Sequence, residues 1–193
     1  MKKINLTLII AIITILSVNA QTTFGVKAGV NFASFSYTAD YIPFEEAEKG
    51  RTSLHFGVVA EIQISDKFSF QPELLFSPQG TSYDNLDWDG GHIQESALKL
   101  SYLTMPLMAK YYVAEGFSLE AGPQIGYLLS ARDAYVDLTY GDNYADDWYE
   151  DTKKVDHGLN FGIGYKLDFG LNFGARYYLG LSHVFYAGDE DEN

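Results

Sequence analysis

The sequence has no cysteine, only two tryptophans and only four histidines among its 193 residues. Without cysteine the chain can form no disulfide and carry no cysteine-linked lipid, which excludes a lipoprotein and a disulfide-stabilised secreted fold. Basic residues are also few, since 13 Lys and Arg stand against 26 Asp and Glu, a formal net charge of −13. We expect no binding to nucleic acid, because its phosphates attract basic surfaces.

A hydrophobic run long enough for a membrane-spanning helix is missing as well. The apolar run Leu6–Val18 is short, whereas a spanning helix needs about 20 apolar residues. It follows two lysines and ends in the compact residues Val18-Asn19-Ala20. This arrangement is typical of a signal peptide, here residues 1–20, cleaved from a single domain of residues 21–193. Since no later stretch is apolar enough for a helix, any membrane-spanning segments of that domain would be strands.

What the sequence has in abundance is tyrosine (15), phenylalanine (13) and glycine (18). Tyrosine and phenylalanine favour strands, and apolar residues alternate with small or polar ones, the signature of a strand. This alternation occurs in seven runs, at residues 24–32, 54–64, 68–76, 103–111, 117–127, 159–167 and 171–181. Each run has about ten residues, twice the usual length of a strand in a soluble protein.

One face of every run is apolar, and the other face carries small, polar and charged residues. A barrel in a bilayer needs this arrangement, with lipid outside and a polar interior. A soluble closed barrel such as a lipocalin has the opposite arrangement and is the alternative fold. We predict an all-β fold: a transmembrane up-and-down antiparallel β-barrel of the eight-stranded type. Its place would be the outer membrane of a Gram-negative cell, in contact with outer-membrane lipid.

The connections between the runs alternate between short and long. The short ones are residues 65–67, 114–116 and 168–170, and the long ones are 37–50, 80–97 and 131–156. Outer-membrane barrels have short periplasmic turns and longer extracellular loops. The pattern therefore predicts that the long segments face outward and that the N-terminus is periplasmic.

Three prolines, Pro72, Pro106 and Pro123, fall inside the alternating runs. Proline lacks the N–H group that a central strand uses in its ladder. We expect these positions to mark either bulges or the true limits of strands.

Four stretches carry a likeness to a known family. They are Gly25–Asn31 (GVKAGVN), Tyr102–Tyr112 (YLTMPLMAKYY), Glu120–Gln124 (EAGPQ) followed by Gly126–Leu129 (GYLL), and Gly174–Tyr177 (GARY) with Gly180-Leu181. In this order they resemble the small outer-membrane barrels called PorT-like, over nearly all of residues 21–183. The resemblance implies an eight-stranded barrel. It implies little about activity, because the secretion role of the family's namesake does not follow from a shared barrel.

The end of the chain departs from that family. After the seventh run comes Gly188-Asp189-Glu190-Asp191-Glu192-Asn193, which has the character of an outer loop, and no eighth alternating run follows. A barrel left open would expose unpaired backbone groups to lipid at a cost of several kcal/mol each. We therefore expect that the eighth strand is missing because the sequence is truncated.

The acidic residues concentrate in the segments 38–50, 81–97, 131–156 and 186–193, which hold 20 acidic and 4 basic residues. Such segments can bind cations or a basic protein partner, or they can simply keep the surface solvated, which we favour. We predict a non-enzymatic scaffold that presents these acidic loops and uses no cofactor. The alternatives are a partner-binding component of an envelope or secretion assembly and a hydrolase of lipid or peptide at the barrel rim.

One loop resembles the first half of a calcium-binding loop. Asn85, Asp87 and Asp89 supply oxygen ligands at alternate positions, and Gly90 allows a turn. The closing glutamate is absent, because Ser96 occupies its position. An ordinary turn rich in aspartate and glycine explains the same residues and is the favoured interpretation.

The four histidines, His55, His92, His157 and His183, are scattered along the chain. Asp156 and His157 lie near the predicted outer rim, where His157 could pair with His55 or His183 in a hydrolytic site. The more ordinary interpretation is that they are polar rim residues, and we predict no catalytic residue.

Counting residues from each short turn predicts which charged side chains point into the barrel. Three acidic and four basic ones face inward in the half near the turns. An eight-stranded barrel has room for side chains but not for a water column, so these charges must pair. We predict an ion network centred on Arg176, Glu73 and Glu120 and no ion conductance. The network comprises Lys27, Glu61, Glu73, Lys110, Glu120, Lys166 and Arg176.

Overall fold

The computed structural model describes residues 22–33, 48–88, 91–137, 142–150 and 152–182, and these form one antiparallel sheet. Its strands are β1 (Thr22–Ala33), β2 (Glu48–Ser65), β3 (Phe68–Trp88), β4 (Gly91–Tyr112), β5 (Phe117–Asp137), β6 (Asp142–Asp147), β7 (Val155–Lys166) and β8 (Asn172–Gly180). The described residues include no helix that is long and apolar enough to cross a membrane. The predicted signal peptide lies outside the described residues.

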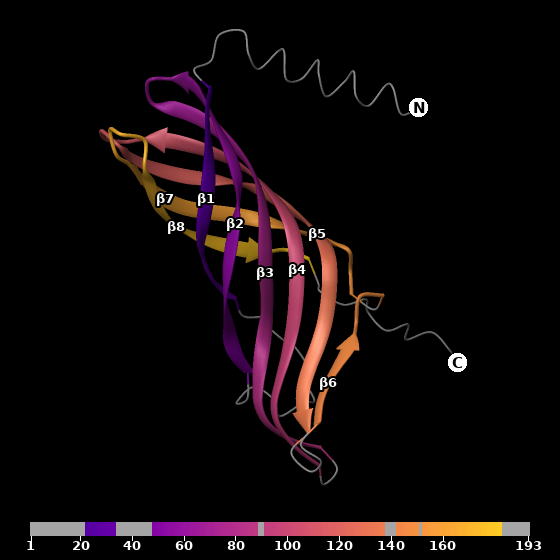
Figure 1. Ribbon diagram of the computed structural model, residues 1–193. Helices are drawn as coiled ribbons and strands as arrows, with labels where there is room; N and C mark the ends of the chain where they lie inside the picture. The colour runs from indigo at the N-terminus through magenta and orange to yellow at the C-terminus, as the bar shows by residue number, and fades with distance from the viewer. Residues whose placement is uncertain (1–21, 34–47, 89–90, 138–141, 151, 183–193) are drawn as a thin grey trace, which may run out of the picture.

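The strands follow one another around a curled sheet. Their order is β1-β2-β3-β4-β5-β7-β8, and the short strand β6 pairs only with β5. The sheet curls so far that β7 and β8 lie behind β1 and β2 (Figure 1). The predicted all-β, up-and-down antiparallel fold and its seven long strands are confirmed. Within the described residues β1 and β8 form the two ends of the sheet, and the expected truncation stays a prediction because residues 183–193 lie outside that part.

The two faces of the sheet differ as a membrane barrel requires. On the convex face Phe24 and Val26 of β1 are 80% and 89% exposed, and exposed apolar side chains recur at every second position of the other long strands. On the concave face Ser69, Thr104 and Ser118 are buried. Apolar residues outside and polar residues inside fit lipid around the barrel, and they do not fit a soluble barrel with an apolar interior.

The three predicted short turns are confirmed, because β2 leads to β3, β4 to β5 and β7 to β8 across only a few residues. Two of these turns contain a glycine in the left-handed region, Gly116 with φ of 72° and Gly170 with φ of 95°. Glycine adopts this conformation without a steric penalty, and it lets the chain reverse within a few residues. All three turns lie at one end of the sheet, which we call the turn end, and the opposite end is the far end.

Two of the predicted long loops are instead mostly strand. Residues 80–97 continue β3 and β4 as a paired hairpin, with Thr81 opposite Leu98 and Asp87 opposite His92. The segment 131–156 likewise begins as an extension of β5, which then pairs with β6. Beyond the apolar band both faces of a strand can be polar, so backbone pairing persists where the alternation of hydrophobicity has ended. In Figure 1 these extensions carry β3, β4 and β5 well past β1.

The prolines neither shift the register nor end a strand. Pro72 lies opposite Leu107, and the offset between β3 and β4 is the same on both sides of it. The same holds for Pro106 opposite Gln124. Each proline instead accompanies a gap of two positions in the pairing with the preceding strand, where its missing N–H leaves the ladder open. The expectation of bulges or strand ends at these residues was therefore wrong.

Candidate functional site

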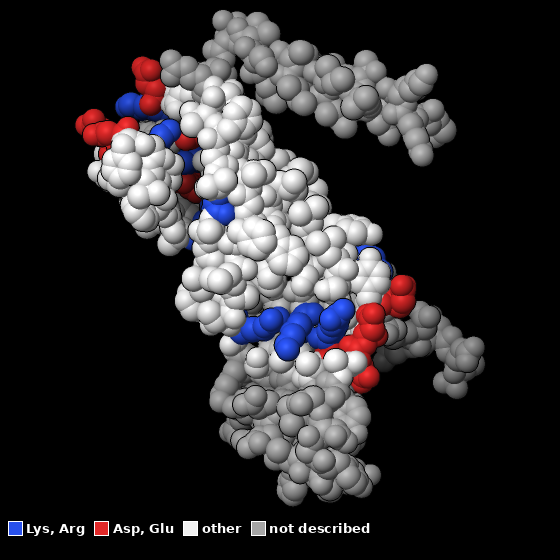
Figure 2. Space-filling model, viewed as in Figure 1, with Lys and Arg blue, Asp and Glu red and all other residues white. Residues whose placement is uncertain are grey.

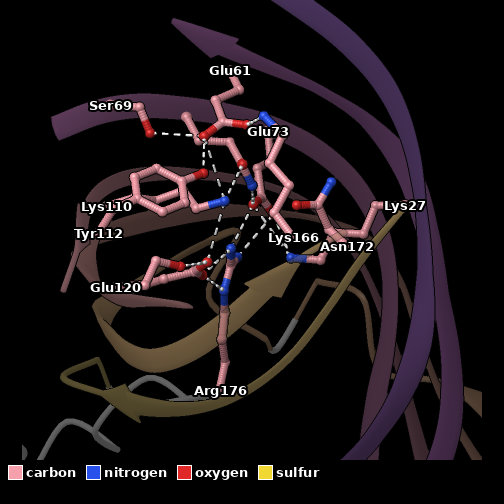
Figure 3. A network of polar contacts seen from close by, with 12 residues as sticks. Lys27, Glu61, Ser69, Glu73, Lys110, Tyr112, Glu120, Lys166, Asn172 and Arg176 are labelled. Atoms are coloured by element: carbon pink, nitrogen blue, oxygen red, sulfur yellow. Dashed lines mark hydrogen bonds and ion pairs between the residues drawn. The ribbon is translucent and has the colours of Figure 1, made fainter. Parts of the chain in front are cut away.

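Every long strand contributes one charged side chain to the interior near the turn end. They are Lys27 from β1, Glu61 from β2, Glu73 from β3, Lys110 from β4, Glu120 from β5, Lys166 from β7 and Arg176 from β8. Figure 3 shows these side chains converging from all around the curled sheet. The structure thus brings together all seven residues that the sequence places in the lumen.

Arg176 holds the centre of this network. Its Nη1 and Nη2 atoms donate to the two carboxylate oxygens of Glu73 at 2.9 and 2.7 Å. Its Nε and Nη2 atoms donate to one oxygen of Glu120 at 3.0 and 2.8 Å. The Glu73 side chain is 0% exposed and also accepts a hydrogen bond from Lys27 Nζ at 3.0 Å. Charge-assisted bonds of this bidentate kind are the strongest that a guanidinium forms.

A second group of contacts surrounds Glu61. Lys166 Nζ lies 2.9 Å from its carboxylate and Lys110 Nζ lies 3.7 Å from it. Lys110 also lies 3.5 Å from Glu120 and donates to Gln71 Oε1 at 3.1 Å. Lys110 therefore joins the two groups, and all seven charges form one connected network.

Neutral polar residues complete the network, and the sequence analysis did not include them. Ser69 and Tyr112 donate to Glu61 at 2.8 and 2.5 Å, and Gln71 donates to Glu73 at 2.6 Å. Each lies an even number of residues from a charged member on its own strand. The same alternation that identified the charges could therefore have identified Ser69, Gln71 and Tyr112.

Two glycines on β7 leave space for the side chains of Glu120 and Arg176. A Cβ atom on Gly164 would lie 2.6 Å from Glu120 Oε1, and one on Gly162 would lie 2.7 Å from Arg176 Cγ. Both distances are shorter than atoms tolerate. The small residues between the apolar positions of β7 therefore make room for the ion pairs of the neighbouring strands.

Farther from the turn end, the interior contacts are single hydrogen bonds between polar side chains. Asn31 Oδ1 accepts a hydrogen bond from His55 Nδ1 at 2.7 Å, and Asn31 Nδ2 donates to Ser77 Oγ at 2.9 Å. Asn160 donates to Gln124 at 3.1 Å. These bonds satisfy side chains in the middle of the lumen and involve no charged pair.

The candidate rim site does not assemble as a catalytic group among the described residues. Asp156 accepts hydrogen bonds from the hydroxyl groups of Tyr178 and Ser182. The His157 side chain is exposed, and its backbone N–H donates to Ser182 Oγ at 3.2 Å. His55 contacts Asn31 instead, and His183 lies outside the described residues. No described contact joins Asp156 to a histidine side chain.

The calcium-loop candidate falls at the tip of the β3–β4 hairpin. The backbone of Asn85 and Asp87 belongs to β3, whereas Asp89 lies outside the described residues. In the part of the chain that is described, no group of three or more acidic or histidine side chains could hold a metal ion. Calcium binding at Asn85, Asp87 and Asp89 stays a prediction.

An apolar cluster lies inside the far end. Leu98, Leu100, Tyr102, Leu128 and Ala131 form a buried cluster, and Tyr149 packs against it. The connection after β6 folds back over the cluster and is held by backbone hydrogen bonds from Trp148 to Ala131 and from Leu128 to Lys154, at 3.1 and 2.8 Å. The Lys154 ammonium lies 3.3 Å from the centre of the Tyr149 ring.

The comparison with known proteins agrees with this architecture. Residues 19–186 match the family described as outer membrane protein beta-barrel domain. No curated protein matches the chain, and no solved structure does. Since the match covers most of the sequence, the chain belongs to the outer membrane protein beta-barrel domain family, and its place is the lipid of the outer membrane.

Proposed function

We propose that this protein is a non-enzymatic barrel with a closed, non-conducting lumen, which presents its acidic far-end segments to the exterior. The observation that carries the proposal is the single network of six ion pairs that connects all seven inward charges. Each acidic member has at least two basic partners. Each basic member likewise has at least one acidic partner, so every charge of the network is paired.

The packing of the network explains why ions would not pass. The side chains of Glu73, Lys110 and Glu120 are 0%, 4% and 6% exposed. An ion crossing this layer would have to break charge-assisted bonds and replace them in a space that side chains already fill. Farther from the turn end, a buried apolar cluster covers the interior side of β4 and β5.

Conductance in planar lipid bilayers tests this proposal. The wild-type protein is expected to show no steady single-channel current. The double substitution Lys110→Ala and Arg176→Ala removes the two side chains that hold the layer together, so it is expected to admit currents if it remains folded. Steady currents through the wild-type barrel would contradict the proposal.

We also propose that the chain groups with the PorT-like barrels. Each of the four similar stretches contributes one network residue: Lys27, Lys110, Glu120 and Arg176. The stretches that resemble the PorT-like family therefore include members of the interior ion network as well as strand residues. The matching test exchanges the four stretches for those of a PorT-like barrel, and the chimera is expected to fold with unchanged heat-modifiable migration.

The orientation we propose places the turn end in the periplasm, because short turns on that side are the rule for such barrels. Protease added to intact cells should then cut within 131–156 and spare residues 114–116. Cleavage at 114–116 in sealed cells would reverse the orientation.

A partner-binding role of the exposed acidic segments is the second candidate function. Covalent cross-linking in native envelopes, followed by purification, tests it.

A further inference from the structure

Basic side chains gather on the convex face at the border between the apolar band and the far end. Figure 2 shows them as a row directly beside the uncharged surface. Lys99 of β4 and Arg132 of β5 are both exposed and are direct cross-strand partners. Arg51 of β2 lies at the same level, since its Nη1 donates at 2.9 Å to Gln79 O and Gly80 is the partner of Lys99. We call these three residues the basic row.

The depth of the basic row matches the edge of a bilayer. Twelve residues separate Lys99 from Tyr111, an exposed aromatic residue near the turn end of β4. At about 3.4 Å per residue and a tilt of about 40°, they rise about 31 Å along the barrel axis. The apolar band of outer-membrane barrels is about 25 Å tall. Lys99 therefore lies just beyond the hydrocarbon, among the headgroups.

The pairing of Lys99 with Arg132 is unfavourable on its own. Like charges at directly opposed positions of an antiparallel pair repel each other. Among the ion pairs of the described residues, none includes Lys99 or Arg132. Asp147 lies opposite Arg132 on β6, and its carboxylate accepts the backbone N–H of Tyr149. Asp147 adjoins only the Arg132 side of the row, since the cross-strand partners of Lys99 are Gly80 and Arg132.

We propose that the basic row binds the phosphate of an anionic lipid in the outer leaflet. A phosphate between Lys99 and Arg132 turns their repulsion into two attractive contacts, and Arg51 adds a third cation at the same level. The surface on the turn-end side of the basic row favours a lipid over free phosphate, because Leu103 and Leu129 are exposed there and can contact acyl chains. The outer-leaflet assignment rests on the orientation proposed above, whereas phosphate recognition does not.

Native mass spectrometry of the full chain in zwitterionic detergent tests the proposal, with lipid A as the probe. Lys99→Gln and Arg132→Gln are each expected to weaken lipid A binding about fivefold, since a basic residue near anionic headgroups contributes about 1 kcal/mol. Lys67→Gln is the matched control, because Lys67 is exposed in a turn at the opposite end, and it should bind like wild type. Lipid A with its phosphates removed should lose affinity for the wild type. Equal binding by Lys99→Gln and Lys67→Gln would overturn the proposal, and so would full competition by inorganic phosphate at concentrations comparable to the lipid.

A second variant separates lipid binding from folding. Lys99→Glu places a carboxylate opposite Arg132 and creates an attractive cross-strand pair. It should leave the thermal unfolding midpoint unchanged or raised while it weakens lipid A binding more than Lys99→Gln does. Undiminished lipid A binding by this variant would refute the basic row as the site, even if the orientation holds. Inverted protease accessibility in cells would refute the orientation alone.

Discussion

The two ends of this barrel are filled in opposite ways. Near the turn end the interior contains seven charged side chains in one network, with Arg176 and Glu73 at its centre. At the far end it contains the apolar cluster around Leu100 and Leu128. The outer surface is apolar along most of its height, so the difference arises inside, from which strands reach each level.

The number of strands that extend to each end explains why the two interiors differ. At the turn end seven strands surround the lumen, so each charge finds a partner from across the barrel, as Arg176 of β8 does with Glu73 of β3. At the far end the cluster comes from β4 and β5, and the connection that carries Tyr149 covers it. A buried charge needs partners in fixed directions, whereas an apolar cluster needs only to exclude water. Where fewer of the described strands surround the interior, apolar filling is therefore favoured.

The largest effect should come from the centre of the charged end. Arg176→Ala leaves Glu73 and Glu120 without their shared partner, and we expect it to lower the free energy of unfolding by about 3–5 kcal/mol. Urea unfolding in lipid vesicles, followed by circular dichroism, measures the change. Arg132→Ala removes an exposed arginine and is the control, with an expected change within about 0.5 kcal/mol. Equal effects of the two substitutions would mean that the network adds no stability.

A substitution in the apolar cluster of the far end should lower the free energy of unfolding almost as much, because it creates a cavity. Leu100 is fully buried, and Leu100→Ala leaves a cavity that is expected to cost about 3 kcal/mol. Leu103→Ala, three positions along the same strand but exposed on the convex face, should cost clearly less. The same urea titration compares them. If Leu100→Ala proved harmless, the far end would be loosely packed and the contrast between the ends would fail.

Adding a methyl group inside the charged end should lower the free energy of unfolding moderately. A Cβ atom on Gly164 would collide with the Glu120 carboxylate and Ser118 Oγ, so Gly164→Ala forces the ion pair of Arg176 to shift. We expect a loss of about 1–3 kcal/mol, typical of overpacking. Gly180→Ala is the control, because its nearest contact would be an ordinary 3.7 Å from Tyr178. Indistinguishable midpoints for the two variants would show that the network adapts freely.

The sequence predicts the part of the molecule where alternation is strict. Lys110 and Glu120 could be placed inside by counting from residues 114–116, because side chains alternate between the faces and the turn fixes the register. The glycines of β7 likewise fit a narrow interior. The partners Gln71 and Tyr112 lie on the same inward faces, but a pattern of charged residues alone does not identify neutral members of the network.

The far end could not be predicted in the same way. Residues 80–97 pair as strands although their composition is that of a loop, because outside the lipid no face must be apolar. The register within this part also shifts, between Ser101 and Tyr102 opposite β5, which counting from the turn cannot detect. The cover provided by Trp148 and Tyr149 depends on tertiary contacts that leave no periodic signal.

The smallest of the expected effects concerns a single hydroxyl group. Tyr112 donates to Glu61 at 2.5 Å, and Glu61 also accepts from Ser69 and Lys166. Tyr112→Phe keeps the ring and removes one donor to a buried carboxylate whose other donors remain, so we expect a loss of about 1 kcal/mol, the usual net contribution of one hydrogen bond. Tyr111→Phe on the exposed face of the same strand is the matched control and should change stability little. Unfolding by urea in lipid vesicles distinguishes the two variants. Should Tyr112→Phe unfold at the same urea concentration as wild type, the carboxylate would be satisfied by its remaining partners, and the Tyr112 hydroxyl would add no stability to the network.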